Sequence, residues 1–269
     1  MISWIGGKSK ISKFIIPYIP KDIETYCEPF GGAFWVYLKM DISLYEKLNK
    51  IVYNDINDYL VNLFMCCKDS ENFYNFLKDY ESQNKELFYL YQKELNENIP
   101  YKIPNFENAM KFAYITTQVW SGISPTTGKF INLKGKYKSK FDTFRDKLIN
   151  DSYVSNLNKI TNFENLDFDS VIKKYDNEGA YFYVDAPYFS TEHYYSKQSF
   201  SFSDHERLAN TLKNIKGRFS MSYYYFDQLK DWFPKDQYNW VTKDFVKAAS
   251  AKPGIKQNVG TELLIMNYQ

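Results

Sequence analysis

Cysteine and histidine are scarce in this chain of 269 residues, which contains three cysteines and two histidines. Cys27, Cys66 and Cys67 are too few for a disulfide framework, and the adjacent pair does not have the spacing of a zinc site. Because His193 and His205 are the two histidines, a histidine-rich metal centre is excluded as well. We therefore expect no metal cofactor.

Long hydrophobic runs are also missing. No uninterrupted apolar stretch comes near the roughly 18 residues that a membrane-spanning helix needs, and residues 1–7 do not follow the basic-then-apolar plan of a signal peptide. Hydrophobic residues still make up 44% of the chain, which is enough for one large domain or for a core domain with a smaller insert. We expect a soluble, cytoplasmic protein that makes no membrane contact.

The net charge is small, +2, and by itself says nothing about a partner. Its distribution is uneven, because residues 121–150 hold seven basic and two acidic side chains. Such a stretch is typical of a nucleic-acid-binding surface, although a lysine run can also be an ordinary solvated face. Turn residues fill positions 121–130, so we expect an exposed basic hairpin or loop carried by helices. The candidate DNA-binding residues are Lys129, Lys134, Lys136, Lys138, Lys140 and Arg145.

An apolar, β-prone run at residues 181–184 is followed by Asp185, Ala186, Pro187 and Tyr188. Pro187 has no N–H to donate to a central ladder, so the strand should stop here and leave the Asp185 carboxylate at its carboxyl end. Ligands of open α/β sheets bind at that end. The Asp185 carboxylate and the Ala186 carbonyl supply two acceptors beside the Tyr188 ring, which could hold the amino group of a stacked base. The same residues are also compatible with a plain proline turn.

A glycine turn and a second strand-end acid point to a nucleotide ligand. Residues 25–38 predict a short strand, a tight turn that contains Gly31 and Gly32, and an apolar helix. Residues 51–55 predict a second strand that ends at Asp55. This is the spacing at which nucleotide-binding α/β units place the carboxylate that holds ribose hydroxyls. The glycine turn and the strand-end acid together indicate a nucleotide site more specifically than either feature alone.

Residues 6–9 read Gly-Gly-Lys-Ser, but they lack the first glycine of a phosphate-binding loop and follow no strand. We interpret them as a glycine turn before a helix over residues 9–17, with Lys8 able to reach a carboxylate or a phosphate. Apolar spacing predicts further helices over residues 56–91, 108–120, 154–160 and 204–213. Strands are expected over residues 218–224, 238–241 and 261–268, the last two as an antiparallel pair.

Five segments have patterns that are specific in combination. Residues 4–8 are similar to W-x-G-G-K, residues 28–33 to E-P-F-x-G, residues 53–57 to N-D-x-N, residues 185–188 to D-P-P-Y, and residues 262–268 to E-L-L-I-x-N-Y. In this order they resemble the Dam-type family of adenine-specific DNA methyltransferases, which use S-adenosylmethionine. The resemblance implies an α/β fold: a Rossmann-like methyltransferase mixed sheet with a carboxyl-terminal antiparallel hairpin and an inserted, mostly helical target-recognition domain.

The resemblance also implies a division of the chain and of its residues. The catalytic domain would comprise residues 1–58 and 152–269, and the target-recognition insert residues 59–151. Residues 185–188 would hold the target base, and Tyr195 would lie near that pocket. The residues expected at the cofactor are Trp4, Lys8, Phe30, Gly31 and Gly32 beside its methionine part, Asp55 at its ribose, Asp167 and Phe168 at its adenine, together with Asp185 and Tyr195.

The implied reaction is methyl transfer from S-adenosylmethionine to the exocyclic amine of an adenine flipped out of double-stranded DNA. A methyltransferase for the cytosine amine or for RNA is one alternative, and the acid at position 185 in place of a serine favours adenine. A catalytically silent DNA-binding relative is another, against which the joint presence of Lys8, Asp55 and Asp185 argues.

Three departures from the family pattern stand out. Ala186 replaces the usual first proline, and Phe34 stands where many relatives have a second glycine. Residues 121–130 lack an arginine that many relatives carry, and arginine is the commonest reader of guanine. The recognition sequence, the oligomeric state and the choice among restriction–modification, phage protection and regulation are therefore left open by the sequence.

Overall fold

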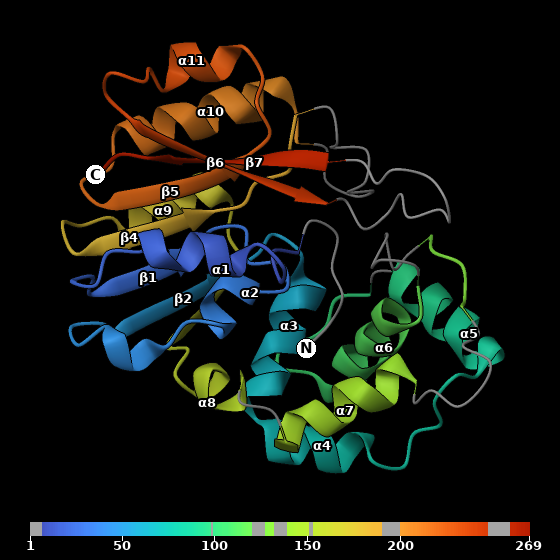
Figure 1. The fold of residues 1–269 in the computed structure, drawn as a ribbon. Helices are drawn as coiled ribbons and strands as arrows, with labels where there is room; N and C mark the ends of the chain where they lie inside the picture. The colour runs from blue at the N-terminus through green and yellow to red at the C-terminus, as the bar shows by residue number, and fades with distance from the viewer. Residues whose placement is uncertain are drawn as a thin grey trace.

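A seven-stranded mixed sheet organises the computed structural model, which describes residues 7–97, 99–119, 127–131, 139–150, 153–189, 200–246 and 259–269 (Figure 1). The strand order is β3-β2-β1-β4-β5-β7-β6. β1 to β5 pair in parallel, whereas β7 pairs antiparallel with both β5 and β6. The strands are β1 (Thr25–Glu28), β2 (Lys50–Asn54), β3 (Asn162–Glu164), β4 (Ala180–Val184), β5 (Arg218–Tyr223), β6 (Asn239–Val246) and β7 (Val259–Met266).

The strand order reverses direction between β1 and β4. β1 pairs with β2 on one side and with β4 on the other, so the carboxyl ends of these three parallel strands meet at one edge of the sheet. In open α/β sheets the crevice at such a switch point is where ligands bind. The glycine turn after β1, Asp55 after β2 and Asp185 after β4 are brought to this edge by the topology alone.

One face of the sheet is built largely from buried tyrosines. Because side chains alternate along a strand, Tyr26, Tyr53, Tyr181 and Tyr183 all point to this tyrosine face, whereas their strand neighbours point to the other. A buried phenol needs a hydrogen-bond partner. These four hydroxyls meet, in chain order, a Glu28 carboxylate oxygen, the Gly32 carbonyl, the Ser220 hydroxyl and the Ser222 hydroxyl.

The opposite face of the sheet is apolar and is covered by α9 (Phe168–Tyr175), α10 (Phe202–Lys213) and α11 (Gln228–Trp232) (Figure 1). α10 begins at a capping box, in which the side chains of Ser201 and Asp204 each accept the other residue's backbone N–H. Its buried stripe is His205, Leu208, Ala209 and Leu212, at the spacing of one helix face. The stripe places the imidazole of a histidine inside the core.

Six further helices form a group beside the sheet, as Figure 1 shows: α3 (Asp58–Lys68), α4 (Ser70–Leu77), α5 (Lys85–Asn96), α6 (Phe106–Thr117), α7 (Lys140–Asn150) and α8 (Tyr153–Asn158). Three of these helices begin at an asparagine cap. The side chains of Asn57, Asn84 and Asn105 accept backbone N–H groups in the first turns of α3, α5 and α6, respectively. The buried residues of this group and those of the tyrosine face belong to one continuous core. The insert at residues 59–151 therefore packs against the sheet, and its function as a separate domain stays a proposal.

The short strand expected within residues 25–38 is confirmed as β1. The predicted strands at residues 51–55, 181–184, 218–224, 238–241 and 261–268 are confirmed as β2, β4, β5, β6 and β7, including the antiparallel pair. The apolar helix after the glycine turn is α2 (Trp35–Leu38). The prediction of continuous helix over residues 56–91 was too coarse, since α3, α4 and the start of α5 share that span. The helix over residues 9–17 is reduced to α1 (Ser12–Ile15) and a 3-10 turn at Ile16–Tyr18, because Pro17 interrupts it.

Besides a 3-10 turn at Ile42–Leu44, four elements were not predicted: β3, α7, α9 and α11. β3 is three residues long, too short for an alternating pattern to be visible, and α7 follows a lysine run that had suggested only a loop. α9 begins where Asp167 caps its first turn. Among the described residues, no helix combines the length and the apolar character that crossing a bilayer requires.

Candidate active site

The segment after β4, residues 185–188, lies at the carboxyl edge of the sheet and is called the corner below. β4 ends at Val184, and the carboxylate of Asp185 follows directly with its side chain 19% exposed. Ala186 and Tyr188 are buried on either side of Pro187. The predicted strand end is confirmed, and the structure places the Asp185 carboxylate and the buried Tyr188 ring at the same edge of the sheet.

Lys8 reaches this corner from the amino-terminal end of the described chain. Its ammonium lies 2.8 Å from an Asp185 oxygen and 3.4 Å from a Glu262 oxygen. It also lies 4.6 Å from the centre of the Tyr188 ring, within range of a cation–π contact. The resemblance had assigned Lys8 to the methionine part of the cofactor. Here its charge is directed at the two carboxylates.

Glu262 is the member of this cluster that the sequence argument missed. It lies in β7 with 1% of its surface exposed, and its carboxylate accepts the Tyr188 hydroxyl at 2.6 Å. The sequence does contain a signal for this residue. Glu262 directly precedes the apolar run of residues 263–266, and a carboxylate buried in such a strand needs a specific partner. Glu262 thereby fixes the far end of the Tyr188 ring.

Burial is the main influence on the acid of the corner. It raises the pKa of Asp185 to about 6, because the charged form loses hydration. The Lys8 ammonium acts in the opposite direction and lowers this pKa, while the Glu262 carboxylate raises it. Asp185 is therefore a carboxylate at neutral pH whose protonation is within reach of mild acid.

The glycine turn and Asp55 form the second part of the site. Asp55 follows β2, and its two carboxylate oxygens accept the backbone N–H groups of Gly32 and Asn57, each at 2.9 Å. Burial raises the pKa of Asp55 to about 6, and the two N–H groups lower it. The acid is thus held in one orientation at the end of the turn, as the spacing of turn and acid had suggested.

Gly31 is required by close approach. A Cβ at this position would lie 2.5 Å from the Tyr53 ring and 2.9 Å from the Asn54 carbonyl. The Gly31 N–H donates to that same carbonyl at 2.7 Å. The Asn54 side chain donates to the carbonyls of Pro29 and Leu166 and accepts the Leu166 N–H. One buried amide therefore ties the glycine turn, the end of β2 and the approach to α9 together.

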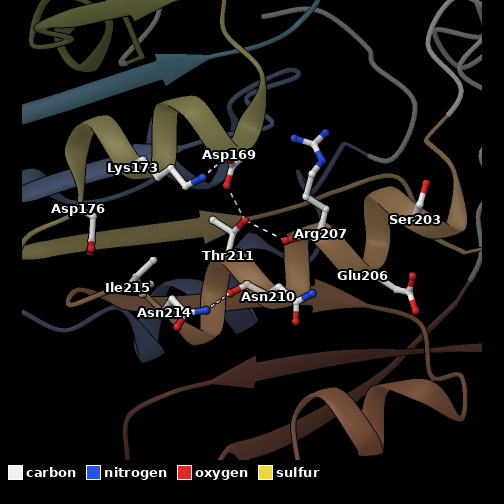
Figure 2. Close-up of a pocket in the computed structure, with 10 residues that line it drawn as sticks. All are labelled: Asp169, Lys173, Asp176, Ser203, Glu206, Arg207, Asn210, Thr211, Asn214 and Ile215. Carbon is white, nitrogen blue, oxygen red and sulfur yellow. Dashed lines mark hydrogen bonds and ion pairs between the residues drawn. The ribbon is translucent and has the colours of Figure 1, made fainter.

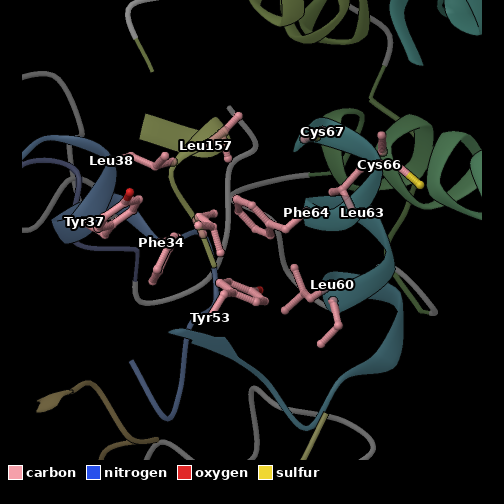
Figure 3. Close-up of a cluster of buried hydrophobic side chains, with 14 of the residues drawn as sticks. Phe34, Tyr37, Leu38, Tyr53, Leu60, Leu63, Phe64, Cys66, Cys67 and Leu157 are labelled. Atoms are coloured by element: carbon pink, nitrogen blue, oxygen red, sulfur yellow. The ribbon is translucent and has the colours of Figure 1, made fainter. Parts of the chain in front are cut away.

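Phe34 shows how the chain accommodates the missing second glycine. Its φ of 56° and ψ of 29° lie in the left-handed region that favours glycine. Its ring is 1% exposed and packs 4.7 Å from the Tyr37 ring and 4.9 Å from the Tyr53 ring, in the cluster drawn in Figure 3. The backbone adopts the glycine conformation, and the ring joins the core of the tyrosine face.

Asp167 and Phe168 begin α9 and contact an arginine that the sequence argument missed. The two guanidinium nitrogens of Arg207 lie 2.5 and 2.9 Å from the two Asp167 carboxylate oxygens. The guanidinium carbon is 4.0 Å from the centre of the Phe168 ring, and the Phe30 ring stacks with that ring at 5.4 Å. Arg207 is the chief reason that the pKa of Asp167 is lowered. A ligand that binds Asp167 must share it with Arg207.

Arg207 also borders an open groove of about 580 Å³ on the outer side of α9 and α10 (Figure 2). Neither Asp55 nor Asp185 lines this groove, so it is separate from the corner after β4. The Thr211 hydroxyl bonds to Asp169 across it and links the two helices. The lining residues are Asp169, Lys173, Asp176, Ser203, Glu206, Arg207, Asn210, Thr211, Asn214 and Ile215.

S-adenosylmethionine fits the donor set in its ribose part. Ribose hydroxyls are donors. Each Asp55 oxygen accepts one backbone N–H, and a carboxylate oxygen offers two lone pairs. The adenine part fits less simply, because Arg207 engages both Asp167 oxygens. No group of three or more His, Cys, Asp or Glu side chains in the described ranges could hold a metal ion.

Several expected site residues lie outside the described residues: Trp4, Tyr195, Lys134, Lys136 and Lys138. Lys129 and Lys140 are described and exposed. Arg145 stays a proposed DNA contact, but it already has partners within the protein. Its guanidinium pairs with Asp142 at 2.7 Å and donates to backbone carbonyls at the end of α4, so it joins α7 to α4 and its side chain is 18% exposed.

Comparison with known proteins finds relatives whose names describe methyltransferases. The type II methyltransferase M.CviBI of Paramecium bursaria Chlorella virus NC1A is 26% identical over 273 residues, which cover 100% of this chain and 99% of that protein. The modification methylase StsI of Streptococcus sanguinis is 22% identical over 223 residues, 76% of this chain and 30% of that protein. A solved structure, the rRNA methyltransferase AviRa of Streptomyces viridochromogenes, has a TM-score of 0.32 and 10% identity over 96% of this chain and 81% of that one.

The family comparison covers almost the whole molecule. A family model described as D12 class N6 adenine-specific DNA methyltransferase matches residues 4–248, a span that contains the glycine turn, Asp55, the helical group and the corner after β4. The chain therefore belongs to the D12 class of N6 adenine-specific DNA methyltransferases.

Proposed function

We propose that this enzyme transfers a methyl group from S-adenosylmethionine to the exocyclic nitrogen of an adenine that has been flipped out of double-stranded DNA. The observation that carries the proposal is the placement of Asp185 and the buried Tyr188 ring at the sheet edge that also bears the glycine turn and Asp55. A stacked and paired amine cannot reach a sulfonium in line, so the base must leave the duplex.

Asp185 and Ala186 act on the amine itself. The adenine amine is a weak nucleophile, because its lone pair is delocalised into the ring. Acceptors at the Asp185 carboxylate and the Ala186 carbonyl draw its two hydrogens and favour the pyramidal nitrogen, a preference that is stronger in the transition state than in the ground state. This nitrogen would take the methyl group that S-adenosylmethionine supplies, the electron pair of the carbon–sulfur bond would stay on sulfur, and one amine proton would leave toward Asp185 or water.

The cofactor supplies an electrophilic methyl group on a positively charged sulfur. Asp55 would hold its ribose hydroxyls, and Phe30, Gly31 and Gly32 would line its methionine part together with Trp4. Asp167 and Phe168 would meet its adenine, and Tyr195 would lie near the pocket. The glycine turn supports this assignment, since Gly31 packs closely against Tyr53 and Asn54 at the end of β2 and the turn lies beside Asp55, which accepts the Gly32 N–H.

Residues 59–151 would recognise the target DNA, with the exposed Lys129 and Lys140 and with Lys134, Lys136 and Lys138 as phosphate contacts. Flipping costs a few kcal/mol, of which stacking on Tyr188 can return about 1–3 kcal/mol. Replacing Lys129 and Lys140 by glutamine should weaken DNA binding and reduce its salt dependence. An unchanged slope of log affinity against log salt would exclude these lysines.

The decisive experiment compares wild-type and Asp185→Ala enzymes for tritiated methyl transfer to plasmid DNA, to a single-stranded oligonucleotide and to RNA, with calorimetric titration of S-adenosylmethionine in parallel. Wild-type enzyme should label adenine in duplex DNA, and Asp185→Ala should lose about two to three orders of magnitude in rate while still binding the cofactor. Near-normal methylation by Asp185→Ala would overturn the proposed role. Labelling of RNA alone would overturn the proposed substrate.

The relatives M.CviBI and StsI are a type II methyltransferase and a modification methylase. We propose a modification role for this chain as well. Mapping the methylated adenines in a plasmid and then challenging it with endonucleases that recognise the mapped sequence should show protection. Methylation scattered over many unrelated sequences would contradict site specificity.

A further inference from the structure

We infer that Tyr223 is a positioning residue for methyl transfer, and that His205 holds it in place. Its hydroxyl contacts the backbone on both sides of Tyr188, the ring proposed to stack on the target base. This inference rests on the proposed function, because the corner that Tyr223 positions is the proposed methyl-transfer site. Neither residue belongs to the five matched sequence segments.

The Tyr223 hydroxyl lies between two peptide groups. It is 3.3 Å from the Pro187 carbonyl, to which it can donate, and it accepts the Phe189 N–H at 3.2 Å. These groups flank Tyr188 directly. The Tyr223 ring also packs against the Tyr188 ring, with centroids 5.1 Å apart and an angle of 36°. One buried side chain at the end of β5 thus contacts both the backbone and the ring of the corner.

His205 supports the hydroxyl from the other side. Its Nδ1 atom is 2.5 Å from the Tyr223 oxygen, and 2% of the histidine is exposed. An unprotonated Nδ1 accepts a hydrogen bond from the Tyr223 hydroxyl. A protonated Nδ1 instead donates to the Tyr223 oxygen, and the hydroxyl then donates to the Pro187 carbonyl. Either tautomer keeps the hydroxyl beside the corner. His205 lies within the apolar stripe of α10, a position where a histidine needs such a polar partner.

Ala186 explains why this corner needs external support. A proline at that position would fix one more φ angle, so the alanine leaves the backbone between Asp185 and Tyr188 less constrained. Tyr188 is anchored at its hydroxyl by Glu262 and at its backbone by Tyr223. Catalysis depends on such placement, because small displacements of a reacting group cost large factors in rate.

The test is Tyr223→Phe, which removes the hydroxyl and keeps the ring. We expect kcat for methyl transfer to fall about tenfold, while the Kd for S-adenosylmethionine and the KM for DNA stay within about twofold. The matched control is Tyr181→Phe, which removes a buried hydroxyl that bonds to Ser220 in the neighbouring strand, away from the corner. It should leave kcat unchanged.

A second pair of variants keeps the inference testable if Tyr223→Phe folds poorly. His205→Ala removes the contact to the hydroxyl, whereas His205→Asn retains a polar atom near the position of Nδ1. We expect His205→Ala to lower kcat and His205→Asn to restore most of it, at equal melting temperature and equal cofactor affinity. We call the contacts of Tyr223 with His205 and with the backbone around Tyr188 the clamp. The clamp is refuted if Tyr223→Phe has the wild-type kcat or if Tyr181→Phe lowers kcat as much as Tyr223→Phe does. It is also refuted if kcat of His205→Asn is no higher than that of His205→Ala.

Asp185→Ala is assayed alongside to separate the two claims. If Asp185→Ala methylates normally, the proposed function itself fails. If Asp185→Ala is inactive and Tyr223→Phe is as fast as wild type, the clamp alone is overturned.

Discussion

The ammonium of Lys8 lies 2.8 Å from the carboxylate of Asp185 and joins the start of the chain to the end of β4. The same ammonium faces the Tyr188 ring. A base amine that bonds to this carboxylate and stacks on this ring must share Asp185 with Lys8 or displace it. Lys8 therefore contributes a positive charge to the corner, and the target base has to replace its contacts with Asp185 and the Tyr188 ring.

The acid limb of the pH–rate profile should lie near pH 6. Burial raises the pKa of Asp185 to about 6, and the acceptor form is the ionised one. The rate should accordingly fall as the pH drops through about 6, rather than near the value of about 4 for a free aspartate. Single-turnover methyl transfer at saturating cofactor measures this limb. Cofactor affinity must be followed in parallel, because Asp55 has a similar pKa.

Lys8→Gln should move that limb upward. Lys8 lowers the pKa of Asp185 and Glu262 raises it, so removing the ammonium leaves two uncompensated carboxylates side by side. We expect a shift of about one pH unit and a slower reaction at neutral pH. Lys10→Gln, at an exposed position, is the control. An unshifted limb in Lys8→Gln would show that the ion pair does not act on Asp185.

Asp55→Asn should weaken cofactor binding and spare DNA binding. The amide keeps one acceptor but presents an N–H₂ group to a backbone N–H of Gly32 or Asn57, which disturbs the turn. The loss should be about 1–3 kcal/mol, equivalent to roughly fivefold to 150-fold in Kd. Calorimetry measures it, with the exposed Asp236→Asn as the control. Equal cofactor affinity in Asp55→Asn and Asp236→Asn would show that Asp55 does not bind the cofactor.

Arg207→Ala should bind the cofactor more tightly than wild type. Arg207 engages both Asp167 oxygens and covers the Phe168 ring, so a cofactor adenine that uses these residues competes with it. The half-exposed ion pair is worth at most about 1 kcal/mol, so the gain should be about two- to fivefold in Kd. Arg218→Ala, which breaks the Arg218–Asp22 pair, is the matched control. A weaker Kd in Arg207→Ala would make the guanidinium part of the adenine pocket instead.

The Phe34→Gly variant should have a higher free energy of unfolding than Phe34→Ala, which is the reverse of the usual order for these two residues. Both substitutions remove the buried Phe34 ring and cost about 3–5 kcal/mol. Glycine regains about 1 kcal/mol, because φ is positive there. Denaturant unfolding of Phe34→Gly and Phe34→Ala gives the difference directly. A more stable alanine variant would mean that the turn relaxes out of the left-handed conformation.

Much of the fold could be predicted because its signals are local. Apolar runs that end at Asp55 and Asp185 mark strand ends, the glycines after β1 mark a turn, and spaced apolar residues mark α3, α6 and α10. β3 was missed because three residues carry no visible period. α9 and α7 were missed although both carry apolar residues at the spacing of one helix face, so their signal was present in the sequence: Phe168, Val171, Ile172 and Tyr175 in α9, and Phe141, Phe144 and Leu148 in α7. Phe34 could be recognised as a departure, but the direction of its ring could not.

The sequence by itself determined which residues end β1, β2 and β4, and through five ordered segments it determined the family. Only the tertiary structure decided that Lys8, Asp185 and Glu262 share one buried cluster, that Tyr223 contacts the backbone around Tyr188, and that Arg207 engages Asp167. The physical reason is that strand ends follow from local pattern, whereas these contacts join residues far apart in the chain. The strand order and the antiparallel β7 bring them together, and burial then raises the pKa of Asp185.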